Sequence, residues 1–314
     1  MSFSHDVKSE LAAYSAAARA DGTMKPCCRL TETCALFLFC RSFGANEMGI
    51  KTEHEDIARM YADAVKDMTG HRVKTEQTGG GKYRIRVDDP VDRQAILSEF
   101  GYSGSEVTRR LNENMLEDDG CRAALFRGAF LTAGTITDPE KDYHLEFVLP
   151  TYGLCTDLMA QLTETGLSPK YVQRGGAHVI YFKDSESVED LLTLMGATES
   201  SLGLMGTKMY KDMRNRVNRR MNFENANSTR TFDAAYKQIE AIRFIEKKRG
   251  LEALPPELRE LARLRLENAD YSLKELGENL SEPISRSGVN HRLQKIMEYA
   301  DDLRLIEKNK NAKS

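Results

Sequence analysis

The feature that most constrains the fold is a repeat in the first two thirds of the chain. Two apolar, helix-like segments, residues 36–44 and 126–134, are each followed by the same order of elements. In both copies a Thr-Gly pair ends a helical segment, glycines join two strand-like runs, and a last helical segment ends at Gly101 or Gly196. Self-similarity of this kind predicts a duplicated unit whose copies meet across a pseudo-two-fold axis. Such a pair makes a symmetric, extended surface that fits a duplex.

Periodicity and turn residues order the elements within each copy. Glycine runs supply the positive φ that tight turns need, so the strand-like runs form two hairpins. These runs are residues 72–77, 82–87, 170–173 and 178–182, joined by Gly79-Gly80-Gly81 and Gly175-Gly176. Each copy therefore follows the order helix, strand, helix, strand, strand, helix. We expect an α+β domain over residues 1–206, with repeats at about 30–101 and 120–197.

Charge is distributed unevenly along the chain. Residues 1–206 hold 22 Lys and Arg against 31 Asp and Glu, a net charge of −9. Residues 207–314 hold 23 against 17, a net charge of +6, and their cations cluster. This asymmetry indicates that contact with a polyanion falls mainly to the C-terminal part.

The cysteines and the apolar segments indicate where the protein works and which sites it lacks. No stretch approaches eighteen uncharged apolar residues, which excludes a membrane span, and Asp6, Lys8 and Glu10 stand where a signal peptide needs an apolar run. The six cysteines show no CxxC spacing, and they are Cys27, Cys28, Cys34, Cys40, Cys121 and Cys155. We therefore expect a cytoplasmic, nucleoid-associated protein with reduced thiols, no zinc site and no cofactor.

A basic helix is expected at residues 208–224, followed by a polar interruption at 225–228 and a second helix at 232–248. We interpret residues 207–250 as a basic helical linker. Its cations spread around more than one face, which suits neutralisation of phosphates rather than reading of bases. A solvated helix between domains has the same pattern. The candidate phosphate ligands are Lys208, Lys211, Arg214, Arg216, Arg219 and Arg220.

A compact three-helix segment follows in residues 251–314. Its expected helices are residues 256–267, 272–280 and 285–300. The last two are short, share one apolar face and are separated by a tight link, which is the pattern of a helix-turn-helix DNA-binding domain. The shared core is formed by Leu273, Leu276, Leu280, Val289, Leu293, Ile296 and Met297.

The second helix of this motif carries the candidate DNA-reading residues. N-terminal residues of such a helix reach base edges in the major groove, where Arg pairs with guanine and Asn with adenine. An ordinary three-helix bundle with a solvated polar face is the alternative. No Asp or Glu lies between Ile284 and Ile296, which favours DNA. The candidates are Ser285, which caps the helix, and Arg286, Ser287, Asn290, His291, Arg292 and Lys295.

The repeated order of elements resembles the LAGLIDADG homing-endonuclease fold, an αββαββα saddle, with residues 36–44 and 126–134 in the place of the motif helices. In that family an acid that binds the divalent metal precedes the closing glycine of each motif. The resemblance assigns these positions to Phe43 and Ala133, whose side chains offer no oxygen ligand. It therefore implies a saddle that has lost its metal and its catalysis, with no metal-binding residues.

The C-terminal motif resembles the WhiA family. The resemblance rests on residues 273–277 and 285–293, on the opening residues 1–8 and on the run 215–219. It implies a bacterial transcription regulator linked to sporulation and cell division, whose C-terminal domain is similar to the promoter-reading domain of sigma factors.

These observations favour a non-catalytic, sequence-specific regulator that binds double-stranded DNA and acts in cell division, chromosome segregation or sporulation. The net acidity of residues 1–206 argues against strong, independent DNA binding by the front domain. Two alternatives stay open. One is an active endonuclease with displaced metal ligands, such as Asp138 or Glu140. The other is an adaptor that binds RNA polymerase or a co-regulator, and the sequence does not show whether the saddle holds a small molecule.

Overall fold

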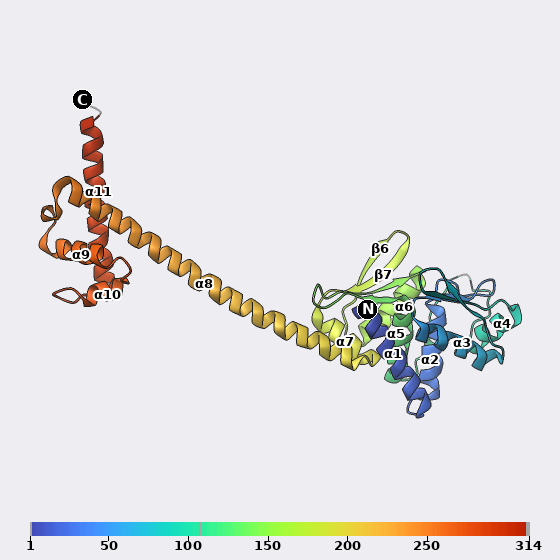
Figure 1. The fold of residues 1–314 in the computed structure, drawn as a ribbon. Coiled ribbons are helices and arrows are strands. Elements are labelled where there is room, and N and C mark those ends of the chain that lie inside the picture. Colours follow the sequence, from blue (N-terminus) through green and yellow to red (C-terminus); the bar gives the residue numbers. More distant parts are fainter. Residues whose placement is uncertain (1, 107, 312–314) are drawn as a thin grey trace. The chain divides into compact units, whose positions relative to one another are not determined.

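The computed structural model describes residues 2–106 and 108–311 (Figure 1). Its residue contacts divide the chain into two units, Met1–Asp212 and Met213–Ser314. The 52-residue helix α8 (Thr198–Arg249) contributes residues to both. Among the described residues no helix is long and apolar enough to span a membrane.

Helices α2 (Pro26–Leu38) and α5 (Asp119–Ala133) pack against each other in the N-terminal unit (Figure 1). The contact is close because Gly128 has no side chain. A Cβ atom added there would lie 2.5 Å from the carbonyl oxygen of Glu32 and 2.7 Å from the Cβ atom of Ala35. The two apolar helices of the repeat therefore form the interface between its copies, which confirms that the copies meet as a pair.

Each copy adds an antiparallel sheet to its central helix. The first sheet has the order β1-β3-β2, formed by β1 (Gly49–Thr52), β2 (Thr75–Thr78) and β3 (Lys82–Arg86). The second has the order β4-β5-β7-β6, formed by β4 (Gly134–Ile136), β5 (Leu145–Leu149), β6 (Lys170–Arg174) and β7 (Ala177–Phe182). Strand β4 was not expected from the sequence, since its three residues directly continue helix α5.

The hairpin turns follow from the glycines. Thr78 pairs with Lys82 around the triple glycine, and Arg174 pairs with Ala177 around Gly175 and Gly176. The latter two glycines have φ values of 56° and 82°, as a two-residue turn with positive φ at both positions requires. Both hairpins expected from the sequence are confirmed.

Two contacts between α2 and α5 indicate how the copies correspond. The Sγ atoms of Cys28 and Cys121 meet at the helix crossing, as do Ala35 and Gly128. In each case residue n of the first copy matches residue n + 93 of the second. The first motif therefore lies at residues 33–41, three residues before the segment inferred from the sequence.

The remaining elements of the N-terminal unit cover these helices and sheets. They are α1 (Phe3–Ala20), α3 (Glu55–Thr69), α4 (Pro90–Glu99), η1 (Glu113–Met115), α6 (Tyr152–Glu164) and α7 (Ser185–Met195). One continuous apolar core joins both copies, with fully buried side chains such as Phe37, Phe126 and Phe147. The duplicated saddle-like fold is thus a single packed body.

The C-terminal unit packs helices around a second core. It contains the end of α8, η2 (Leu251–Ala253), α9 (Pro256–Glu267), α10 (Leu273–Glu278) and α11 (Arg286–Asn311). Leu276, Leu280, Val289, Leu293 and Ile296 are buried together, as expected from their spacing. Helix α9 has the bounds expected from the sequence, whereas α11 runs eleven residues past Ala300, where the expected helix ends.

The expectation that polar residues interrupt the helix at 225–228 is wrong. Helix α8 continues through this stretch from Thr198 to Arg249. Asn and Ser compete for backbone hydrogen bonds and so weaken a helix, but the cost per residue is well below about 1 kcal/mol. Helix formers on both sides are enough to carry the helix across.

Candidate nucleic-acid interface

Helices α10 and α11 form a tight helix-turn-helix. Ser272 and Glu275 make a reciprocal capping box at the start of α10, with a 3.2 Å hydrogen bond from the Glu275 amide to the Ser272 hydroxyl. Gly277 lets the link come close, because a Cβ atom there would lie 2.4 Å from the carbonyl oxygen of Ile284. Ser285 caps α11 by accepting from the Gly288 amide at 3.2 Å, as expected.

The first turns of α11 present a polar face to solvent. Ser285, Arg286, Ser287, Asn290, His291 and Lys295 are exposed, while Val289 and Leu293 face the core. All six side chains can form hydrogen bonds and none of them is an acid, and two of them, Arg286 and Lys295, are cations. This face can therefore contact base edges and phosphates.

Arg292 differs from its neighbours. Its side chain is 21 % exposed, and its Nη2 atom lies 3.5 Å from Glu257 Oε2 of helix α9. The guanidinium is directed toward an acid within its own unit. Arg292 therefore ties α11 to α9, and its predicted role in reading bases has less geometric support than that of Arg286 or Asn290.

The six candidate phosphate ligands of α8 fall into two groups. Lys208 lies 3.6 Å from Glu189 and 3.8 Å from Glu186 of α7, and Lys211 donates to the carbonyl oxygen of Pro139 at 2.6 Å. These two lysines hold α8 against the N-terminal unit. The other four are exposed, and they are Arg214, Arg216, Arg219 and Arg220.

A basic sheet face was missed by the sequence analysis. On the β1-β3-β2 sheet Ile50 and Ile85 point into the core, so that Lys51, Arg84 and Arg86 lie on the outer face. Lys51 and Arg84 are directly paired across the strands. The signal is visible in the alternation of basic and apolar residues from Lys82 to Arg86, but the net charge of the whole domain hid it.

A cavity of about 640 Å³ opens at the C-terminal ends of α2 and α5. Residues that follow or end these helices line it, among them Cys40, Arg41, Thr132 and Ala133. Lys51, Arg84 and Arg86 of the basic face also reach it. Among its lining residues, all of which are described, Glu47 is the single carboxylate, so the cavity is positively charged.

The chemistry of this cavity does not fit a divalent cation. The residue that corresponds to Ala133 is Cys40 rather than Phe43, which is buried against Tyr102 beyond the end of α2. Burial raises the pKa of the Cys40 thiol to about 12, so the thiol is protonated at neutral pH. A methyl group and a neutral thiol offer no hard ligand, whereas Mg²⁺ prefers several oxygens. Asp138 and Glu140 do not line the cavity.

The whole chain shares its fold with a solved structure. The crystal structure of full-length DUF199/WhiA from Thermatoga maritima covers 96% of this chain and 99% of its own, with a TM-score of 0.53 and 21% sequence identity. This similarity shows the fold, an α+β LAGLIDADG-like domain followed by a helical domain, as the sequence predicts.

Family models match both parts of the chain. The WhiA LAGLIDADG-like domain matches residues 122–214, and the WhiA C-terminal HTH domain matches residues 217–300. A protein of Alkaliphilus oremlandii named probable cell division protein WhiA is 38% identical over 96% of this chain and 98% of its own. The protein of that name from Clostridium novyi is 36% identical over 97% of this chain and 99% of its own. The chain belongs to the WhiA family.

Proposed function

We propose that this protein is a sequence-specific, double-stranded DNA-binding regulator of transcription without nuclease activity. The observation that supports the proposal is the exposed, acid-free first part of α11, which follows a tight turn and leaves Arg286, Asn290 and His291 open to solvent. The arginines Arg214, Arg216, Arg219 and Arg220 of α8 supply phosphate contacts that do not depend on sequence.

The names of its relatives as probable cell division proteins support a role in this process. We infer that the regulated genes act in cell division, chromosome segregation or sporulation, and that the protein associates with the nucleoid. Genome-wide footprinting of the bound protein tests this, with Asn290→Ala as the variant that loses binding sites and Lys274→Ala on α10 as the exposed control. Equal site maps for wild type and Asn290→Ala would reject base reading by α11.

Loss of catalysis is supported by the residues at the helix ends. Without acids at positions 40 and 133 a phosphodiester has no metal to polarise it or to activate water. A plasmid-cleavage assay with Mg²⁺ and with Mn²⁺ tests this directly. Sustained turnover that disappears in Glu47→Gln would establish an endonuclease with displaced ligands instead.

An adaptor that binds RNA polymerase or a co-regulator is the second candidate. Its support is a row of exposed apolar side chains on α8, namely Met209, Met213, Val217 and Met221, which recur every four residues and share a helix face. Gel shifts with genomic and random DNA at moderate salt separate the two functions. Absence of any sequence preference favours the adaptor.

A further inference from the structure

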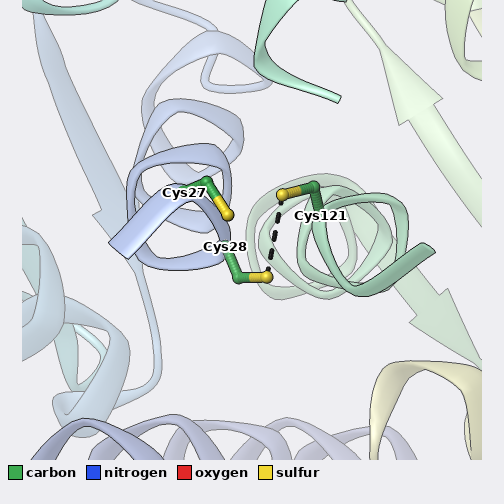
Figure 2. A group of neighbouring side chains, drawn as sticks. All are labelled: Cys27, Cys28 and Cys121. Atoms are coloured by element: carbon green, nitrogen blue, oxygen red, sulfur yellow. Dashed lines mark hydrogen bonds between the residues drawn. The ribbon is translucent and has the colours of Figure 1, made fainter. Parts of the chain in front are cut away.

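Three thiols gather where α2 and α5 begin. Cys27 and Cys28 are in the first turn of α2, and Cys121 is in the first turn of α5. Their Sγ atoms all lie within 4.8 Å of one another, and those of Cys28 and Cys121 are 3.7 Å apart (Figure 2). The cluster therefore joins residues that are more than 90 positions apart in the chain.

We propose that Cys27, Cys28 and Cys121 form a binding site for a thiolate-preferring metal ion of the Zn²⁺ class. This site lies outside the functions proposed above and does not depend on them. On binding, each thiol releases its proton and becomes a thiolate ligand. The lack of CxxC spacing predicts no zinc site, but these three ligands come from two helices that are distant in the sequence.

The distances between the thiols are compatible with a metal ion held among them. In a tetrahedral site with Zn–S bonds of about 2.3 Å, neighbouring sulfur atoms are about 3.8 Å apart. The Cys28–Cys121 separation of 3.7 Å already has this value. A disulfide would need the two atoms at about 2.05 Å and would leave the third thiol without a role.

An acidic side chain and two helix N-termini lie beside the three thiols. Asp118 is the N-cap of α5, and its Oδ1 atom lies 3.9 Å from Cys28 Sγ and accepts from the Cys121 amide, while its Oδ2 atom lies 2.6 Å from Lys25 Nζ. Both helices begin at the cluster, and the positive ends of their dipoles oppose the hydrogen bonding and burial that raise the pKa of the Cys27 and Cys28 thiols. Cys28 and Cys121 are buried, but Cys27 is partly exposed and gives an ion a route of entry.

The position of the site predicts its effect. α2 and α5 are the two central helices of the repeat, and their opposite ends line the basic cavity. An ion held by both N-termini would clamp the copies together at the end away from that cavity. Metal binding should therefore raise the thermal stability of the N-terminal unit.

Metal titration of the full chain tests the proposal. Reduced, metal-free protein is titrated with Zn²⁺ against a chromogenic chelator, and with Cd²⁺ while thiolate charge-transfer absorption is recorded. We expect one ion per chain. The affinity for the ion should fall by more than about 100-fold in Cys121→Ser, because loss of a ligand costs more than loss of a group that only hydrogen-bonds to a ligand. Cys155→Ser, which changes a buried thiol elsewhere in the same unit, is the matched control and should bind as wild type.

A second variant covers the case in which Cys121→Ser does not fold. Cys27 is partly exposed, so Cys27→Ser should fold and still lose the ion. Absence of binding by the wild type would overturn the proposal, as would equal loss in Cys155→Ser or retained affinity in Cys27→Ser. A Cys28–Cys121 disulfide in protein that binds no metal when reduced would assign the cluster to redox chemistry instead.

Discussion

The two units place their cations differently. In the C-terminal unit they stand on helix faces, at Arg286 on α11 and at Arg216 and Arg219 on α8. In the N-terminal unit the outer face of a sheet carries Lys51, Arg84 and Arg86, although residues 1–206 have a net charge of −9. A phosphate responds to charges within a Debye length of about 8 Å in physiological salt. The net charge of a domain therefore does not determine whether one of its surfaces binds a polyanion.

The units also bury a cation in different ways. Arg265 of the C-terminal unit is 2 % exposed and donates to Gln238 Oε1 at 2.9 and 3.0 Å and to the Tyr271 carbonyl oxygen at 2.6 Å. Lys8 of the N-terminal unit is 9 % exposed and lies over the Phe130 ring at 5.9 Å. Burial lowers the pKa of Lys8 to about 8, so the stability of the N-terminal unit increases as the pH rises above this value.

The largest expected effect is on the helix crossing of the N-terminal unit. Gly128→Ala should reduce its free energy of unfolding by about 3 kcal/mol, because the added methyl group meets the backbone of α2. Thermal denaturation followed by circular dichroism measures this. Gly203→Ala on α8 is the control, since no heavy atom lies within 4 Å of its added methyl group. It should be neutral or stabilising by up to about 1 kcal/mol. Equal destabilisation by both variants would contradict the close crossing.

Base reading should depend on the C-terminal unit. Arg286→Ala and Asn290→Ala should each reduce the preference for a target over a scrambled site by about 1–3 kcal/mol, since bidentate contacts to bases are lost. Competition gel shifts measure the ratio. Lys274→Ala should leave it unchanged. A uniform loss of affinity for every sequence, with the ratio intact, would assign these residues to phosphate contact.

Lys8→Met tests the cost of the buried charge in the N-terminal unit. Because the pKa of Lys8 is about 8 in the folded state and 10.5 when unperturbed, the folded state binds fewer protons between these values. Stability therefore rises with pH through this window, and the cost of the buried charge is fully present below pH 8. The variant should be more stable than wild type by about 1–3 kcal/mol at pH 7, and less so at pH 10. A constant difference across pH would exclude a charged Lys8.

The smallest effects test which unit meets phosphates. Arg216→Ala or Arg219→Ala should weaken binding to every DNA sequence alike, by less than about 1 kcal/mol in moderate salt. Each change should also reduce the slope of log K against log salt by about 1, as expected for the loss of one phosphate contact. The double variant Arg84→Ala and Arg86→Ala on β3 tests the N-terminal unit in the same way. Gel shifts over a series of salt concentrations give the salt slope of each variant. An unchanged slope in the β3 variant would confine DNA contact to the C-terminal unit and α8.

Much of the fold follows from local signals in the sequence. Gly175 and Gly176 fix their hairpin because few other residues adopt positive φ at both turn positions. Ser285 fixes the start of α11 because its hydroxyl satisfies a free amide of the first turn. The buried face of the helix-turn-helix follows from helical spacing alone. These features each depend on a few neighbouring residues, which is why a sequence without a structure is enough to locate them.

Other features depend on residues far apart, and only the tertiary structure decided them. The correspondence of Cys40 with Ala133 follows from the contact between Ala35 and Gly128, which no local pattern encodes. The thiol cluster exists because the helix crossing brings Cys121 to Cys28. The basic face of β3 becomes a surface only because Ile85 and Ile50 are buried beneath it. Packing between distant segments sets these positions, whereas turns and caps are determined by local chain conformation.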